Sequence, residues 1–126
     1  MSTDNEASGV KSAQGVYGKV IGIINDRHQL DAFLQSLSVL GVSDVEILDG
    51  LAGIQRIEAL QETVSGYFFG DMEGEMLQRY LEAAKSDLIV FAAEVNPESA
   101  DKAAEIAQKH GASEVVHFGN SVVTSY

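Results

Sequence analysis

The chain of 126 residues contains no cysteine and no tryptophan. Without cysteine it cannot form disulfides, thiolate metal sites or a cysteine nucleophile. No apolar run approaches the roughly 18 residues that a membrane-spanning helix needs, so we expect no membrane partner. Basic residues are scarce, because 8 Lys and Arg stand against 19 Asp and Glu, for a net charge of −11. They are scattered singly, so no basic patch offsets the negative field, and we expect no nucleic-acid partner.

The length is that of a single domain, and the hydrophobic share of 45% is ordinary for a globular protein. Residues 1–15 are polar, small and without periodicity. They lack the basic start and apolar middle of a signal peptide. We therefore expect a disordered N-terminal tail over residues 1–15, one domain over residues 16–126, and a cytoplasmic protein.

What the sequence does contain is an internal repeat with an offset of 70 residues, because residues 41–50 align without a gap on residues 111–120. An amphipathic stretch precedes each copy, and an apolar run precedes each stretch. In the first stretch Leu30 and Phe33 occupy the phase that Ala100 and Ala103 occupy in the second. The repeat predicts a strand–helix–strand unit that is used twice.

Caps and turn residues place the elements. Asp26 and Gly41 bracket the first helix, and Asn96 with Pro97 begins the helix that Gly111 ends. The expected strands cover residues 19–24, 44–48, 88–95, 114–118 and a short return within 121–126. Residues 50–86 are the part that the repeat does not explain, and they predict one helix over about 54–64 and another from about 71.

Two such units in one small domain predict a ferredoxin-like α+β fold, with a helical insertion between the two βαβ repeats. Strands 19–24 and 88–95 would be central, and strands 44–48 and 114–118 would be edges. The alternative is a flavodoxin-like α/β three-layer sandwich, in which residues 54–86 supply a crossover helix of a parallel sheet.

The two central strands are apolar on both faces, whereas the helices of a simple ferredoxin-like sheet cover only one. A bare apolar face of that size is unusual on a monomer. Either residues 50–86 fold over it or a second copy of the chain does. We expect a homodimer.

Few residues point to chemistry. The three histidines lack the spacing of a helical metal motif, and no phosphate-binding loop or nucleophile elbow is present, so we expect no metal, no cofactor and no catalytic set. Glu94 would be a candidate acid with a perturbed pKa if it faced the core, although a solvent-facing strand end is the commoner situation. The candidate ligand-binding residues are mainly aromatic: Tyr67, Phe69, Tyr80 and His117.

Three stretches resemble a known family. They are VIGIINDRHQLDA at residues 20–32, LQRYLEAA at 77–84 and VHFG at 116–119. Over residues 17–121 the chain resembles the small bacterial proteins grouped as general stress and heat-induced stress proteins, except that a glycine often seen before the third strand is replaced by Ser86 and Asp87. The resemblance implies a ferredoxin-like or related α+β fold and a stress association, and it supplies no catalytic residues.

Together these observations favour a non-enzymatic cytoplasmic protein that is associated with stress and acts through self-association or a protein partner. One alternative is a regulatory module that binds a small molecule at a dimer interface. Another is a small ferredoxin-like enzyme of the dimeric-barrel type, which would need a polar residue such as His117 or Glu94 facing a closed cavity.

Overall fold

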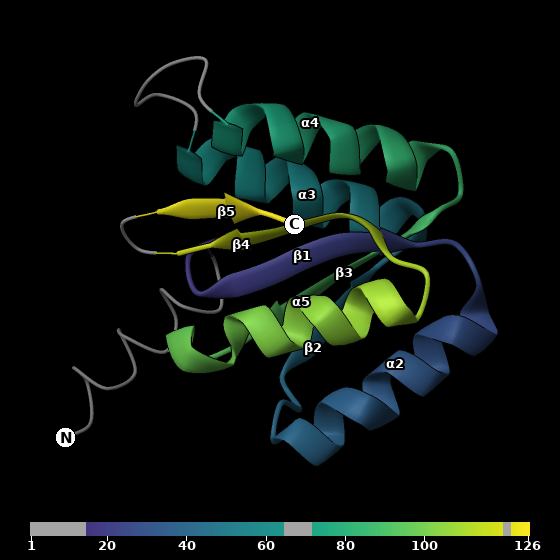
Figure 1. Ribbon diagram of the computed structural model, residues 1–126. Coiled ribbons are helices and arrows are strands. Elements are labelled where there is room, and N and C mark those ends of the chain that lie inside the picture. Colours follow the sequence, from purple (N-terminus) through teal and green to yellow (C-terminus); the bar gives the residue numbers. More distant parts are fainter. Residues whose placement is uncertain (1–14, 65–71, 120–121) are drawn as a thin grey trace, which may run out of the picture.

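The computed structural model describes residues 15–64, 72–119 and 122–126. The elements, in chain order, are β1 (Lys19–Ile24), α2 (Arg27–Leu40), β2 (Val45–Leu48), α3 (Gly50–Val64), α4 (Met72–Lys85), β3 (Ile89–Glu94), the 3₁₀ turn η1 (Pro97–Ser99), α5 (Ala100–Lys109), β4 (Ser113–Phe118) and β5 (Val123–Ser125). The five strands form one sheet in the order β2-β3-β1-β4-β5, and every neighbouring pair is antiparallel (Figure 1). Of the expected tail, only Gly15 lies within the described residues.

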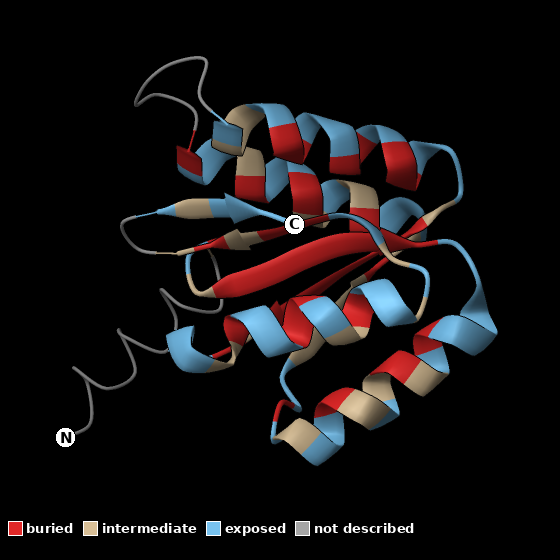
Figure 2. Ribbon diagram, viewed as in Figure 1, coloured by how far each residue is buried: buried red, intermediate tan, exposed pale blue. Residues whose placement is uncertain are grey.

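Helices cover both faces of the sheet, so the domain has three layers (Figure 1). Side chains alternate between the faces of a strand. In β1, Val20 and Ile24 therefore pack towards α2 and α5, whereas Ile21 and Ile23 pack towards α3 and α4. Every residue of β1 is buried as a result (Figure 2).

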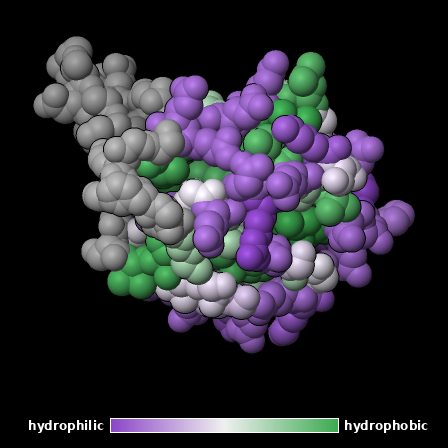
Figure 3. Space-filling model, turned by 90° about the horizontal axis from the view of Figure 1, so that it is seen from above, coloured by the Kyte–Doolittle hydropathy of each residue, from purple (hydrophilic) through white to green (hydrophobic). Residues whose placement is uncertain are grey.

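The insertion between the repeats covers the second apolar face. Ile57 and Leu60 of α3, with Leu77 and Tyr80 of α4, are at most 1% exposed and pack on the sheet. The outer side of this layer is mostly hydrophilic, with smaller apolar patches between the polar side chains (Figure 3). One chain thus accounts for the covered face that suggested a second copy, and the homodimer itself stays a prediction.

The expected mixed α+β class is confirmed, with a five-stranded antiparallel sheet and four α-helices in the part of the chain that the structure describes. The flavodoxin-like alternative anticipated the three layers but was wrong about strand direction, because its parallel sheet is replaced by four antiparallel pairings. The expected edge at β4 was also wrong. β5 returns alongside β4, so the edges of the sheet are β2 and β5.

Equivalent caps confirm the internal repeat. Gly41 and Gly111 follow α2 and α5 with φ of 96° and 85°, in the left-handed region that glycine tolerates. The next residue in each copy turns back to the helix in the same way. Val42 N donates to Leu37 O at 2.8 Å, and Ala112 N donates to Ala107 O at 3.0 Å. Both hydrogen bonds close the helix end as in a Schellman motif.

Two helix starts differ from the expectation. α3 begins at Gly50, directly after β2, and is longer than the short helix expected from residue 54. Pro97 opens the 3₁₀ turn η1, and the α-helix follows only from Ala100. Asn96 precedes the turn without a side-chain capping hydrogen bond, whereas Asp26 does cap α2 by accepting from His28 N at 2.7 Å.

The two cores are filled by different means. On the α2 and α5 side, Phe33 meets Phe91 edge-on with ring centroids 4.6 Å apart, and Phe91 lies across Gly22, where a Cβ would come within 2.9 Å of its ring. α5 contributes four buried alanines, at positions 100, 103, 104 and 107. Small side chains let α5 lie close to the sheet, while each large buried side chain contributes about 1.5–3 kcal/mol.

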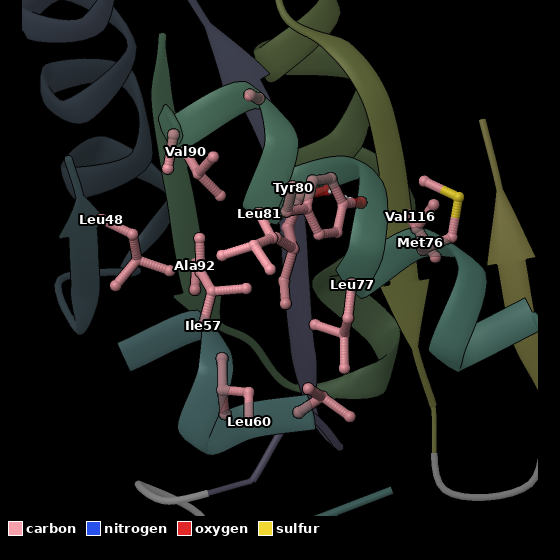
Figure 4. Packing of buried hydrophobic residues seen from close by; sticks show 14 of the residues in the cluster. Leu48, Ile57, Leu60, Met76, Leu77, Tyr80, Leu81, Val90, Ala92 and Val116 are labelled. Atoms are coloured by element: carbon pink, nitrogen blue, oxygen red, sulfur yellow. Dashed lines mark hydrogen bonds between the residues drawn. The ribbon is translucent and has the colours of Figure 1, made fainter. Parts of the chain in front are cut away.

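Tyr80 connects α4 by hydrogen bonds to the place where the pairing of β1 and β4 is irregular. The pairing of β1 with β4 shifts register between Ile21 and Ile23, and Glu114 sits there with φ of 52°. The Tyr80 side chain points from α4 into this core (Figure 4). Its hydroxyl lies 2.7 Å from Glu114 O and 3.2 Å from Ile21 O, so it donates to the backbone at the register shift. Burial raises the pKa of Tyr80 far above its ordinary value, which keeps the hydroxyl a donor.

We predict that Tyr80→Phe lowers the free energy of unfolding by about 1–3 kcal/mol, because it leaves a buried carbonyl without its donor. Urea unfolding at neutral pH measures the change. The matched control is Tyr126→Phe, which removes the exposed hydrogen bond to Asp101 and should cost no more than about 0.5 kcal/mol. Equal losses in the two variants would contradict the role of Tyr80.

Candidate functional site

Of the residues expected to bind a ligand, the two that the structure describes, Tyr80 and His117, are not brought together. Tyr67 and Phe69 lie outside the described residues. Tyr80 is buried in the core beneath α3 and α4. His117 pairs with Val20, whose side chain faces α2 and α5, so His117 lies on the opposite side of the sheet from Tyr80. Burial lowers the pKa of His117, and the Asp101 carboxylate of α5 opposes that shift.

The other histidines and the acids give no metal centre. His110 caps α5, as its position before Gly111 predicts, and its Nε2 lies 3.3 Å from Ser36 Oγ on α2. Within residues 15–64, 72–119 and 122–126, no group of three His, Cys, Asp or Glu is placed to hold a metal ion. A small-molecule site must therefore be sought elsewhere.

Lys19 stands out from the rest of the core. It is the only charged residue that is buried in the described part of the chain, with 3% of its surface exposed. Charged side chains are almost never buried to this extent unless they are paired. Lys19 opens β1 and is followed by five buried residues, so its own side chain is drawn into the sandwich between the sheet and the α3–α4 layer.

The Lys19 ammonium contacts a backbone carbonyl and a carboxylate. Nζ donates to Gly15 O at 2.9 Å and lies 3.9 Å from Glu94 Oε1. Glu94 ends β3 directly opposite Lys19 in the antiparallel register, which puts both side chains on the same face of the sheet. The Glu94 side chain is 31% exposed, so this ion pair joins a buried cation to a carboxylate at the rim.

A cavity of about 220 Å³ opens beside this pair and is lined by Lys19, Asp44, Glu46, Ala92 and Glu94. A second cavity of about 260 Å³, next to the start of η1, shares Asp44 and Glu94 with it. The hydrogen bond of 2.9 Å from Glu94 N to Asp44 O fixes these two shared residues against each other. The two cavities therefore adjoin each other, and Asp44 and Glu94 line both of them.

The charges around the first cavity have both signs. Burial lowers the pKa of Lys19, and the Glu94, Glu46 and Asp44 carboxylates partly offset that effect. Arg56 of α3 forms a two-pronged ion pair with Glu46, with Nε–Oε2 at 2.9 Å and Nη2–Oε1 at 3.3 Å. This pairing fixes the far wall of the cavity, because both guanidinium and carboxylate are planar.

Sequence reasoning singled out Glu94 but missed Lys19. Glu94 is a strand-end residue with partial exposure, as the commoner situation predicts, and it also faces a buried cation. The signal for Lys19 was a lysine at the start of an otherwise apolar strand. What the sequence could not supply is the register that places Glu94 and Asp44 beside it.

Comparisons with known proteins add no assignment. No family model, no curated protein and no solved structure matches this chain. The resemblance to general stress proteins accordingly stays a prediction. None of the helices within the described residues has the length and apolar character required to cross a bilayer.

We predict that Lys19→Met changes the free energy of unfolding by no more than about 1 kcal/mol at neutral pH. Methionine keeps the apolar stem and avoids burying an ammonium, while the remaining carboxylate is in contact with water. Glu46→Leu, which breaks the pair with Arg56, is the matched control at the same rim. A loss of about 3–5 kcal/mol for Lys19→Met would show that the fold itself requires the lysine.

The pH dependence has a definite sign. Because the pKa of folded Lys19 is lowered from 10.5, the unfolded chain binds more protons between the two pKa values. Wild-type stability therefore rises with pH in that window, and the Lys19→Met variant lacks this rise. Unfolding curves at increasing pH should show any advantage of methionine shrinking as pH approaches 10.5. A constant difference would contradict the lowered pKa.

Proposed function

We propose that this protein is a small-molecule-binding module and that the cavity beside Lys19 is its binding site. The observation that carries the proposal is the burial of one charged side chain, Lys19, at the wall of a cavity in a core that is otherwise apolar. Natural sequences break the rules of core packing mainly at functional sites. A buried lysine at a cavity wall is the kind of exception to apolar packing that a binding site would account for.

The lining favours a small polar ligand. A volume of about 220 Å³ is below the roughly 300 Å³ at which pockets for drug-sized ligands begin. One ammonium and three carboxylates line it, with the methyl group of Ala92 as the apolar floor. Such a site orients a ligand by hydrogen bonds and charge more than by apolar contact.

We also infer that β2, β3, β1 and β4, with α2 and α5, make up a ferredoxin-like unit to which the α3–α4 hairpin and β5 have been added. The order β2-β3-β1-β4 supports this, since two interleaved strand–helix–strand units produce it. The resemblance to general stress proteins supports the further proposal of a stress-associated role in the cytoplasm.

Self-association is the second candidate. The sheet ends at β5, a strand of three residues, and Val122 beside it is 64% exposed. An open edge of this kind can pair with the same edge of a second copy. A homodimer built in this way would leave the Lys19 cavity at the other side of the sheet accessible, so the two proposals are compatible.

Native mass spectrometry of protein purified without added ligand tests the binding module. We expect wild-type protein to retain a small compound and Lys19→Met to bind it about tenfold more weakly or worse, because a hydrogen bond to a charged group contributes about 1.5–3 kcal/mol. Lys102→Met is the control, since Lys102 is exposed on α5 and pairs with the nearby Glu105 of the same helix at 3.6 Å.

Two results would contradict the binding proposal. One is equal retention by wild type and Lys19→Met. The other is an empty wild-type protein that also shows no ligand-induced rise in melting temperature, relative to Lys19→Met, across a panel of small polar compounds. The same spectra give the number of chains, for which the self-association proposal expects two.

A further inference from the structure

Lys19 differs from the other described lysines in its surroundings. Lys85, Lys102 and Lys109 are exposed on helices, whereas Lys19 is enclosed by the core and lines a cavity. An exposed lysine is a mobile, strongly hydrated cation, but an enclosed one is held in place and partly stripped of water. Lysines of the second kind serve as nucleophiles towards carbonyl compounds.

We propose that the Lys19 amino group captures small neutral aldehydes as an imine within this cavity, an inference that rests on the proposed function of the cavity as a binding site. Three features of the geometry support it: a fixed amine, a proton acceptor beside it, and room for a small reactant.

The amine is fixed because its aliphatic stem is buried and Nζ donates to Gly15 O at 2.9 Å. The proton acceptor is Glu94, whose Oε1 lies 3.9 Å from Nζ and whose side chain also reaches solvent. The room is the cavity of about 220 Å³ that both residues line. A cavity that holds the amine and the aldehyde next to each other makes their reaction faster than a collision in solution would.

The charges around the cavity select the reactant. Asp44, Glu46 and Glu94 all line it, so a carbonyl compound that carries its own carboxylate meets repulsion from several sides. A neutral aldehyde does not. The chain also has no cysteine, so no thiol competes for the aldehyde.

The pKa of Lys19 is set by groups that lower it and groups that raise it. Burial lowers its pKa, and Arg56 of α3 acts in the same direction. Glu94 of β3, Glu46 of β2 and Asp44 before β2 raise it. The net lowering increases the fraction of neutral amine at a given pH, which is the form that attacks a carbonyl carbon.

The reaction is balanced without an added reagent. Glu94 takes one proton from the Lys19 ammonium by way of one solvent water, which a separation of 3.9 Å requires, and the neutral Nζ attacks the carbonyl carbon. A second proton moves from nitrogen to the former carbonyl oxygen, which gives a carbinolamine. Glu94 returns its proton to the hydroxyl, the C–O bond breaks, and water leaves. The product is a protonated imine, so an aldehyde and an ammonium become an iminium and one water.

Reductive trapping tests the proposal. Intact wild-type protein is incubated with limiting propanal and cyanoborohydride at neutral pH, and peptide mass spectrometry reports the N-propyl group on each lysine. We expect Lys19 to be labelled about tenfold faster than Lys85, Lys102 or Lys109, because the cavity holds its amine beside Glu94 and its lowered pKa leaves more of it neutral. In urea-unfolded protein all lysines should react alike.

Labelling of Lys19 no faster than that of Lys102 in the folded protein would overturn the imine. So would a preference for Lys19 that persists in the unfolded chain, since that would come from local sequence and not from the cavity. If Lys19 is labelled slowly while wild-type protein retains a compound that Lys19→Met releases, the imine proposal is wrong and the small-molecule-binding proposal is supported. If Lys19 is labelled slowly, wild-type protein is empty and no compound of the panel raises its melting temperature relative to Lys19→Met, both proposals fail.

Discussion

The whole structure depends on excluding water from both faces of β1 and β3. These strands lie inside the sheet and carry apolar side chains on each side, so two cores form, one beneath α2 and α5 and one beneath α3 and α4. The repeated unit supplies only the first pair of helices. The inserted hairpin supplies the second, and this is why residues 50–64 and 72–85 are part of the core and not a peripheral addition.

Because helices cover both faces of the sheet, a binding site is expected at the edges and ends of its strands. Inside, polar groups such as the Tyr80 hydroxyl are used to satisfy backbone carbonyls at an irregular pairing. At the corner where β1 begins and β3 ends, charged side chains line a cavity. Lys19 belongs to both environments, because its stem is in the core and its ammonium faces the carboxylates.

Local signals predicted much of this fold. The bounds of β1, the Asp26 cap and the glycine ends at Gly41 and Gly111 depend on neighbouring residues alone, so the sequence contains them. Pairing across long separations is different. That Glu94 lies opposite Lys19, and that Tyr80 and His117 face opposite sides of the sheet, follows from register, which apolar periodicity does not specify. The Lys19 cluster was missed for the same reason, since residues 19, 44, 46 and 94 are brought together only by strand pairing.

The central claim is that Lys19 is a partly desolvated amine at a cavity wall. Its most direct test is a titration of the lysine side chains by nuclear magnetic resonance, which follows each Cε signal with pH and assigns Lys19 by comparison with Lys19→Arg. The account predicts that Lys19 titrates below its ordinary value of 10.5. A Lys19 that titrates at or above 10.5 would show that the ammonium is as well solvated or as strongly paired as a surface lysine, and would contradict the account.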